Sequence, residues 1–514
     1  MRKTLKLTLP ALLLGATALM ALPAFAETTL VVARSTDSDG LDPHKISTTV
    51  SSQVTDLIFD TLVTLDSSGQ AQPGLAESWE VSEDNLTYSF KIRSGVVCHD
   101  GSPFGAEDVA FTFERALSPE IANPRLSNYG PIEKVSQDGD VVSVKMSAPY
   151  GPFLSMLGSF NVPMICRSAV AADGAFTPIG TGVFEFIEWV RNDHISLKAN
   201  ETYQGFSPLI ENKGRPHVDN LKLVVIPEAV ARMAALRSGE VDLAEPSLEE
   251  AALLKSESGF KVHAAELSGQ QSMAAFTWKR APLDNPDVRR AIGMGLDRDA
   301  YAAIAYEGLA NATTCPVAPG LLGVDLEKCA EWGTKYDPEA ARAILAGLGY
   351  SESNKLKIKL SAHALPGFDQ MHQMMQQHLS EIHVEAELEI REVAAFFDYM
   401  AAENQRTEGV PVLWTMGYSG VDPDYMATMW QQPGFVNMGI GEELDALLAA
   451  QSTLSGEERV AKLQEAQKYL LENTYAVPLL SPGWSWLWAS SDKIDGFKTG
   501  FMATLILNDV TKAD

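Results

Sequence analysis

The sequence predicts an α/β protein made of two blocks, each with alternating strands and helices. In the first block, residues 184–199 alternate between apolar and polar side chains, which predicts a pair of strands in a sheet. In the second block, apolar residues at helical spacing over 371–382 precede an alternating stretch over 384–390, which predicts a helix followed by a strand. The chain has 514 residues, 46% of them apolar, which is enough for two or three domains with substantial cores.

Local signals justify the elements of the first block. We expect a first strand over Thr29–Ala33 and a helix from about Thr48 to Phe59. Gly239 stands where a left-handed helix cap is expected, and a strand over Glu240–Leu243 follows it. The helix before this cap begins at Glu228, and its apolar positions are Val230, Met233, Ala234 and Leu236.

Gly180 and Gly182 flank Thr181 in the same block. Such a pair suits a tight turn, in which a positive φ angle or a close approach of two backbone segments excludes a side chain. We interpret these residues as part of the structural scaffold, and we do not expect them to contact a ligand.

Helix caps mark the second block. Asn285 is a suitable N-cap, and Pro286 suits the first helical position. Ser455 and Glu458 form a predicted capping box ahead of a helix, and Ala476–Leu480 is the expected returning strand. The methionines at helical spacing in this block are interpreted as core residues rather than as metal or ligand contacts.

The first 26 residues have the pattern of a cleavable signal peptide. Three basic residues precede an apolar run over Leu7–Leu22, and Ala24-Phe25-Ala26 supplies the small residues of a cleavage site. The sequence predicts cleavage before Glu27 and export of a soluble chain to the periplasm. Because no Cys lies near this site, a lipid anchor is not expected. An uncleaved N-terminal anchor is the alternative.

The chain is strongly acidic. Its formal net charge is −27, and the removal of the three basic residues of the signal peptide makes it more negative. An acidic surface repels phosphate backbones and anionic lipid head groups, so the charge disfavours nucleic acids and membrane surfaces as partners.

The four cysteines are even in number, which fits an exported protein with disulfides, and four cysteines allow three pairings. Cys315 and Cys329 bracket a loop rich in Pro and Gly, so a bridge between them is expected. Cys98 is interpreted as a small buried residue. Without CxxC spacing or paired histidines, no cysteine is assigned a metal or catalytic role.

Four segments, taken together in their order and spacing, carry a family resemblance: Pro178–Gly182, Glu188–Val190, Lys198–Asn200 and Arg232–Leu243. They resemble the core signature of the peptide/nickel-type extracytoplasmic solute-binding proteins of ABC transporters, the family 5 proteins that include dipeptide- and oligopeptide-binding proteins. The resemblance covers nearly the whole mature chain. It implies a two-lobe periplasmic-binding-protein fold, shaped like a clam shell, that closes around a solute by hinge motion.

The resemblance also implies a domain division. After a signal peptide over 1–26, the first lobe would hold residues 27–268 and 488–514, and the second lobe residues 269–487. Residues of about 60–178 would form an extra small domain in the first lobe, because Pro73–Phe113 resembles that part of the family. The expected crossings between lobes are Leu267–Met273 and Ser481–Trp486.

The segment Trp414–Asp424 resembles the main cleft loop of the family, in which aromatic side chains hold a solute and polar ones fix its polar groups. Its aromatic residues could equally belong to the core. The residues that we expect to contact the ligand are Ser47, Thr48, Gln271, Ser272, Trp414, Tyr418, Ser419, Asp422 and Trp486.

The chain departs from the pattern of the peptide binders at one position of this loop. Where they commonly carry an Asp that neutralises the α-amine of the peptide, this chain has Val421, and Asp422 is a substitute only if the loop is shortened. The loop around His363 also lacks the Arg that dipeptide binders often use for the carboxylate. A modified peptide, an opine, an oligosaccharide or a metal chelate therefore competes with a short free peptide as the expected ligand.

The resemblance implies a periplasmic binding protein of an ABC importer, which binds a peptide or peptide-like solute between its lobes and delivers it to a membrane permease. No cofactor is expected, and the protein is expected to be a monomer. The sequence contains no Gly-x-Ser-x-Gly, His-Glu-x-x-His or Walker A motif, so an enzyme is not predicted. A hydrolase that uses Asp422 and Asp424 and a sensor or chaperone with the same fold are the alternatives.

Overall fold

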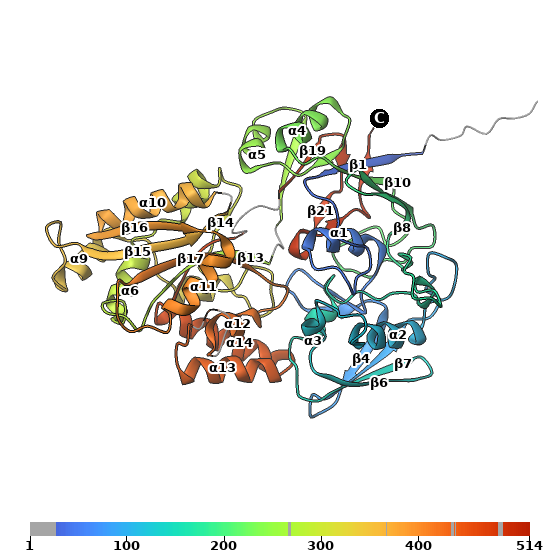
Figure 1. Cartoon of the computed structure of the whole chain (residues 1–514), viewed down its shortest axis with the longest axis horizontal. Helices are drawn as coiled ribbons and strands as arrows, with labels where there is room; N and C mark the ends of the chain where they lie inside the picture. The colour runs from blue at the N-terminus through green and yellow to red at the C-terminus, as the bar shows by residue number, and fades with distance from the viewer. Residues whose placement is uncertain are drawn as a thin grey trace, which may run out of the picture.

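Two lobes lie side by side in the computed structural model, which describes residues 27–265, 269–365, 367–432, 436, 438–481 and 487–513 (Figure 1). The first lobe holds a seven-stranded sheet of order β12-β19-β11-β1-β10-β9-β8, and the second holds a six-stranded sheet of order β14-β18-β13-β17-β15-β16. Helices pack on both sheets, so the predicted α/β class is confirmed. Every helix in the described ranges is too short or too polar to cross a lipid bilayer.

The first lobe is built around three parallel strands, because β1 pairs in parallel with both β10 and β11. The predicted hairpin is β8 and β9, which pair antiparallel. The strands are β1 (Thr29–Arg34), β8 (Phe184–Val190), β9 (His194–Ala199), β10 (Asn220–Val225), β11 (Leu243–Ala244), β12 (Phe260–Ala264) and β19 (Leu487–Ser491), and the helices are α1 (Thr49–Ile58), α4 (Ala229–Ser238) and α5 (Leu248–Lys255).

A smaller four-stranded sheet of order β4-β5-β7-β6 forms with its helices a separate layer next to the first lobe (Figure 1). Its own apolar core includes Phe90, Phe113 and Tyr129, all fully buried. Its elements are β4 (Ala76–Val81), β5 (Thr87–Ile92), β6 (Ile132–Asp138), β7 (Val141–Met146), α2 (Ala106–Leu117) and α3 (Phe153–Leu157), and the hairpin of β2 (Val63–Leu65) and β3 (Ala71–Pro73) lies beside it.

The sheet of the second lobe separates two apolar cores, because successive residues of a strand face opposite sides. In β17, Leu413 joins one core and Trp414 the other. The strands are β13 (Gln270–Phe276), β14 (Asn311–Ala312), β15 (Leu356–His363), β16 (Val384–Arg391), β17 (Val412–Ser419) and β18 (Ala476–Ser481). The helices are α6 (Pro286–Met294), α8 (Leu326–Trp332), α9 (Pro338–Gly347), α10 (Phe368–Glu381), α11 (Val393–Glu403), α12 (Tyr425–Trp430), α13 (Glu442–Thr453) and α14 (Gly456–Glu472).

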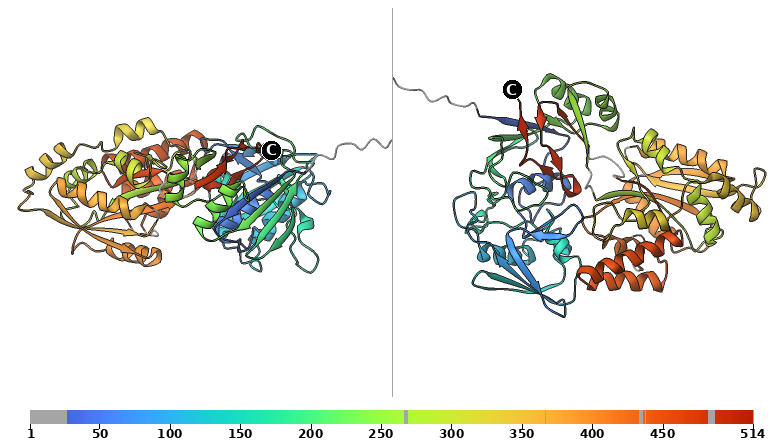
Figure 2. Two further views of the ribbon diagram at one scale, coloured as in Figure 1. Left: turned by 90° about the horizontal axis from the view of Figure 1, so that it is seen from above. Right: turned by 180° about the vertical axis from the view of Figure 1, so that it is seen from behind.

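The chain passes between the two large sheets twice. It leaves the first lobe after β12 and enters the second at β13, which begins at Gln270, and it returns from β18 to β19, which begins at Leu487. Of the second expected crossing, Ser481–Trp486, residues 482–486 lie outside the described residues. The first crossing therefore ends earlier than expected, since Gln270–Met273 already belong to β13. The C-terminal segment lies beside β1 (Figure 2), where Lys512 Nζ donates to the carbonyl oxygen of Thr29 at 3.0 Å. The exact domain boundaries remain a prediction.

Two disulfides join the four cysteines. The expected Cys315–Cys329 bridge is present, and Cys98 is bonded to Cys166, across 68 residues of sequence. Cys98 is buried as expected, but it is not a free thiol. The sequence did not indicate its partner, because the two cysteines are 68 residues apart.

Several local predictions are confirmed. Gly239 has a φ angle of 77° and ends α4, and the Asn285 side chain accepts a hydrogen bond from the backbone N–H of Asp287 at the start of α6. Gly180 and Gly182 are required by close approach rather than by a positive φ, because an added Cβ would lie 2.3 Å from the Ile58 carbonyl oxygen at Gly180 and 2.5 Å from the Ile58 carbonyl carbon at Gly182.

Other local predictions are wrong. Val230 is 71% exposed, because the buried side of α4 is formed by Arg232, Met233, Ala235 and Leu236. The strand expected over 240–243 comprises only Leu243–Ala244. Ser455 does not cap α14 with its side chain, since its hydroxyl is hydrogen-bonded to Asn85 Oδ1 of the small four-stranded layer.

Candidate ligand-binding site

A cavity of about 520 Å³ lies at the carboxyl edge of the seven-stranded sheet. Ser35 and Glu245, the residues directly after the parallel neighbours β1 and β11, line it. In open α/β sheets, ligands bind outside the carboxyl ends of the strands. The volume falls within the range of about 300–1,000 Å³ that is usual for small-molecule sites. Leu487 and Trp488, the first residues of β19, complete the wall.

Glu245 places a carboxylate in the wall of this cavity. Its Oε2 atom accepts hydrogen bonds from the Ser35 backbone N–H at 2.8 Å and from the Ser35 hydroxyl at 2.6 Å. Among the described residues, its Oε1 atom has no hydrogen-bond partner. One oxygen thus fixes the side chain, and the other can accept a hydrogen bond from a ligand.

Arg232 places a guanidinium in the same wall. Its Nε atom donates to the Glu245 carbonyl oxygen at 2.7 Å, and its Nη1 atom donates to the carbonyl oxygens of Ile226 and Pro227. Burial lowers the pKa of Arg232, and the nearby Glu245 carboxylate opposes this shift. Since an Arg side chain keeps its charge in proteins, the cavity wall carries one positive and one negative group held by fixed contacts.

Arg34 connects β1 to α1 behind the cavity. Its side chain donates to Gln53 Oε1 at 3.1 Å and to the Val50 carbonyl oxygen. Gln53 lines the cavity, and its Nε2 atom donates to the Ala503 carbonyl oxygen of the C-terminal segment at 3.0 Å. Helix α1 is therefore held between the sheet and the C-terminal segment.

Ser47 and Thr48 lie at the start of α1 and are exposed. Both bind Asp39, and the Thr48 hydroxyl also accepts a hydrogen bond from the Ser51 backbone N–H as the N-cap of α1. The next residue, Thr49, lines the cavity. Ser47 and Thr48 thus lie at the edge of the cavity, and their side chains already form hydrogen bonds at the start of α1.

Gln271 and Ser272 lie in β13 and are fully buried. The Gln271 Nε2 atom donates to the Cys315 carbonyl oxygen at 2.6 Å, and its Oε1 atom has no partner within the described residues. The Ser272 hydroxyl accepts a hydrogen bond from the Leu480 backbone N–H at 3.2 Å. Neither residue lines the 520 Å³ cavity.

The expected cleft loop is largely a strand, since β17 extends to Ser419. Trp414 is fully buried, and its indole N–H donates to Asn404 Oδ1 at 3.0 Å. Tyr418 is 9% exposed, and its hydroxyl donates to the Pro316 carbonyl oxygen at 2.7 Å. Both rings pack in the core of the second lobe.

The remaining predicted residues lie at or beyond the end of β17. Ser419 is half-buried and pairs with Gln270. Asp422 is buried, and Arg459 binds both of its carboxylate oxygens. Trp486 lies outside the described residues. The ligand contacts expected of the second lobe therefore stay predictions.

Sequence reasoning missed Ser35 and Glu245, and it interpreted Arg232 only as part of the scaffold. A signal was present, because Glu245 lies two residues after the strand predicted over 240–243, and strand ends at one sheet edge are where ligands bind. The strand order that makes β1 and β11 neighbours is not visible in the sequence.

Residues 70–437 match the family of bacterial extracellular solute-binding proteins, family 5. The glutathione-binding protein GsiB of Escherichia coli strain K12 is 28% identical over 481 residues, which cover 90% of this chain and 91% of that protein.

Two solved structures share the fold. HbpA2 from Haemophilus parasuis has a TM-score of 0.80 and 22% identity, and it covers 95% of this chain and 100% of its own. The second is the ABC transporter-associated periplasmic binding protein DppA from Helicobacter pylori, in complex with peptide STSA. It has a TM-score of 0.66 and 24% identity, and the match covers 95% of this chain and 99% of that chain. Since the family match spans more than half of its residues, the chain belongs to the family 5 extracellular solute-binding proteins of bacteria.

Proposed function

We propose that this protein binds a peptide or peptide-like solute in the 520 Å³ cavity and delivers it to the permease of an ABC importer. The observation that carries the proposal is the position of the cavity at the carboxyl ends of β1 and β11, with the start of β19 in its wall. The glutathione-binding relative and the peptide-bound DppA structure support a ligand of this class.

Glu245 and Arg232 would recognise the charged ends of the solute. The free Oε1 atom of Glu245 suits an ammonium group, and the Nη2 atom of Arg232, which donates no hydrogen bond among the described residues, suits a carboxylate. Val421 offers no charge in the second lobe, and Asp422 is already neutralised by Arg459. Glu245 is therefore our candidate for the role that an Asp has in the peptide binders.

The other expectations complete the proposal. Residues 1–26 would be removed as a signal peptide, and the mature chain would work in the periplasm as a monomer, with no cofactor, no nucleic acid partner and no enzymatic activity. The two lobes would comprise residues 27–268 with 488–514, and residues 269–487. Ser47, Thr48, Gln271, Ser272, Trp414, Tyr418, Ser419 and Trp486 remain candidates for ligand contacts when a solute is bound.

Native mass spectrometry of the purified protein, followed by isothermal titration calorimetry, tests the ligand class. We expect saturable binding of glutathione or of a short peptide, and weaker binding of the same molecule after N-acetylation, which removes the ammonium charge. Binding of an opine, an oligosaccharide or a metal chelate in place of every peptide would overturn the peptide assignment. Chemical conversion of the bound solute would contradict a role as a pure binding protein.

Glu245→Gln tests the site itself. The loss of one hydrogen bond to a charged group is worth about 1.5–3 kcal/mol, so affinity for the free peptide should fall by about 10- to 150-fold. The acetylated peptide should bind the variant and the unchanged protein alike. Glu240→Gln, an exposed carboxylate of the same lobe that does not line the cavity, is the matched control. Equal loss for both peptides would contradict an ammonium contact.

A further inference from the structure

We propose that a second cavity in the first lobe binds a protonated primary amine that carries a hydrogen-bond acceptor close by. This cavity has a volume of about 130 Å³ and lies around the C-terminal end of α1, whereas the 520 Å³ cavity lies along the N-terminal half of that helix. The proposal does not depend on the solute of the larger cavity.

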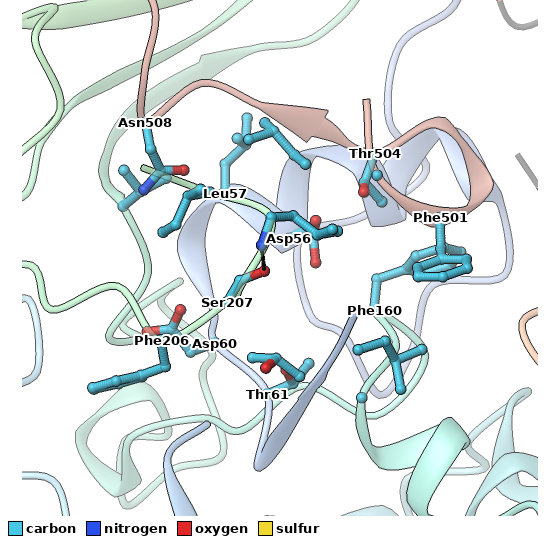
Figure 3. A pocket seen from close by; sticks show the side chains of 18 of the residues that line it. Asp56, Leu57, Asp60, Thr61, Phe160, Phe206, Ser207, Phe501, Thr504 and Asn508 are labelled. Carbon is cyan, nitrogen blue, oxygen red and sulfur yellow. Dashed lines mark hydrogen bonds between the residues drawn. The ribbon is translucent and has the colours of Figure 1, made fainter. Parts of the chain in front are cut away.

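Two carboxylates line this cavity. Asp56 lies in the last turn of α1, and Asp60 follows four residues later, just beyond the helix end (Figure 3). The C-terminal end of a helix carries a partial negative charge from its unpaired carbonyl groups. The helix end and both side chains therefore add negative potential at the same place.

Neither carboxylate has a basic partner within the described part of the chain. Asp60 Oδ2 accepts a hydrogen bond from the Thr181 hydroxyl at 2.7 Å, and Asp56 is hydrogen-bonded to the Thr504 side chain. Both are neutral donors, which leave the negative charge uncompensated. A buried carboxylate without a counter-ion is unfavourable by several kcal/mol. A cation in the cavity would remove this penalty.

Burial raises the pKa values of both carboxyl groups. It raises the pKa of Asp56 to about 7, with a smaller contribution from the charge of Asp60, and it raises the pKa of Asp60 to about 6. Both side chains keep some accessible surface because they face the cavity. At neutral pH the pair thus retains negative charge for an ammonium group to bind.

Asn508 supplies an independent indication of a ligand. Its side chain is 5% exposed and lines the same cavity, and its Nδ2 atom has no hydrogen-bond partner in the described residues. The Tyr203 side chain lies nearby and interacts with Asn508, but its hydroxyl does not have the geometry of a hydrogen bond with Nδ2. A buried N–H donor requires an acceptor. The ligand therefore needs an acceptor beside its amine, as in an amino alcohol or an amino acid head group.

The remaining wall connects the cavity to the second lobe. Phe501 lines the cavity and also packs in the apolar core of the second lobe that contains Trp414. The next two residues, Met502 and Ala503, both have a φ angle of 55°, which is strained for residues other than Gly. Strain of this kind is typical of ligand sites. Phe501 and Thr504, which flank the strained pair, both line the cavity.

Titration with ethanolamine tests the proposal, because it carries an amine next to a hydroxyl acceptor, and ethylene glycol is the uncharged probe of similar size. We expect saturable heat of binding with ethanolamine alone. Asp56→Asn and Asp60→Asn should each weaken binding at least tenfold. Asp140→Asn, which alters an exposed carboxylate on the turn after β6, should leave it unchanged.

Ser207→Phe provides a variant that keeps both carboxylates and fills the cavity, so it remains informative if an Asp variant does not fold. It should abolish ethanolamine binding. The absence of saturable binding to the unchanged protein, or an affinity in both Asp56→Asn and Ser207→Phe that equals that of the unchanged protein, would overturn the proposal. Competition with the solute of the larger cavity would identify the amine as part of that solute, and additive binding would identify a separate small amine.

Discussion

Arg459 binds Asp422 through two hydrogen bonds, from Nη1 to Oδ2 at 2.8 Å and from Nη2 to Oδ1 at 2.6 Å, and both side chains are almost fully buried. Burial alone would raise the pKa of Asp422, but the charge and hydrogen bonds of Arg459 lower it. Ser155 of α3 also hydrogen-bonds to Asp422, so the pair lies where the second lobe meets the small four-stranded layer.

Asp422→Asn should therefore act mainly on stability. Removal of one member of a buried ion pair leaves the other charge uncompensated, and it typically lowers the free energy of unfolding by about 3–5 kcal/mol. Urea unfolding measures this change. Glu465→Gln breaks the exposed pair with Lys462 and should cost less than about 1 kcal/mol. A similar small loss for both variants would contradict a structural role for Asp422.

The pair also shows what the sequence could not reveal about the expected cleft loop. Trp414, Tyr418 and Asp422 have the residue types of a binding loop, and the same types also build a core. Arg459 lies 37 residues further along the chain on α14, so nothing near Asp422 indicates its partner. The apolar alternation that predicted β8 and β9 is local, whereas the partners of Trp414 and Asp422 depend on tertiary packing.

The free energy of unfolding should fall as the pH rises from about 4 to about 7, because of Asp56 and Asp60. Their pKa values are raised in the folded state, so the folded protein keeps protons that the unfolded chain releases in this window. Tyr203 lies close to both carboxylates and stays neutral in this window, because burial raises its pKa.

The Asp56→Asn/Asp60→Asn double variant should lack this loss. The difference in the free energy of unfolding between this variant and the unchanged protein should shift in favour of the variant by up to a few kcal/mol from pH 4.5 to pH 8, since one pKa unit corresponds to about 1.4 kcal/mol. Urea unfolding at both pH values, with Asp140→Asn as control, measures the difference. The same difference in the free energy of unfolding at both pH values would argue against raised pKa values of Asp56 and Asp60.

Lys255 should stabilise the contact between the lobes. Its ammonium group, at the end of α5 in the first lobe, donates to the carbonyl oxygens of Glu307 at 3.1 Å and Gly308 at 3.3 Å in the second. Lys255→Met should favour an open arrangement and weaken solute binding by about 2- to 10-fold, the equivalent of about 0.5–1.5 kcal/mol.

Calorimetry and small-angle X-ray scattering would detect the weaker binding and a larger radius of gyration. Lys261→Met is the matched control, because Lys261 donates to the Ile494 carbonyl oxygen within the first lobe. An unchanged radius and affinity in Lys255→Met would show that this contact does not hold the lobes together.

The two disulfides should contribute unequally to stability. In the chain-entropy description, a bridge over 68 residues contributes about 4 kcal/mol and one over 14 residues about 3 kcal/mol. Paired Ser substitutions at Cys98 and Cys166 should therefore lower the free energy of unfolding more than those at Cys315 and Cys329. Urea unfolding of the two double variants compares them, and the reverse order would contradict the entropic account.

The candidate sites were harder to predict than the fold for a physical reason. Glu245, Arg232 and Asp56 each lie in an ordinary local setting, at a strand end or on a helix. They become distinctive only because β1 and β11 are neighbours and because the C-terminal segment packs against α1. Asn508 and Thr504 reach the second cavity from the far end of the chain, which no local pattern indicates.

The contact of Gly180 and Gly182 with Ile58 has a practical meaning for attempts to change what this protein transports. Both cavities share α1, and these glycines fix the depth at which its last turn sits. A side chain introduced at either glycine would displace the common wall and alter both cavities at once. Libraries that aim at a new specificity should therefore leave residues 180–182 untouched and vary the two ends of the helix separately.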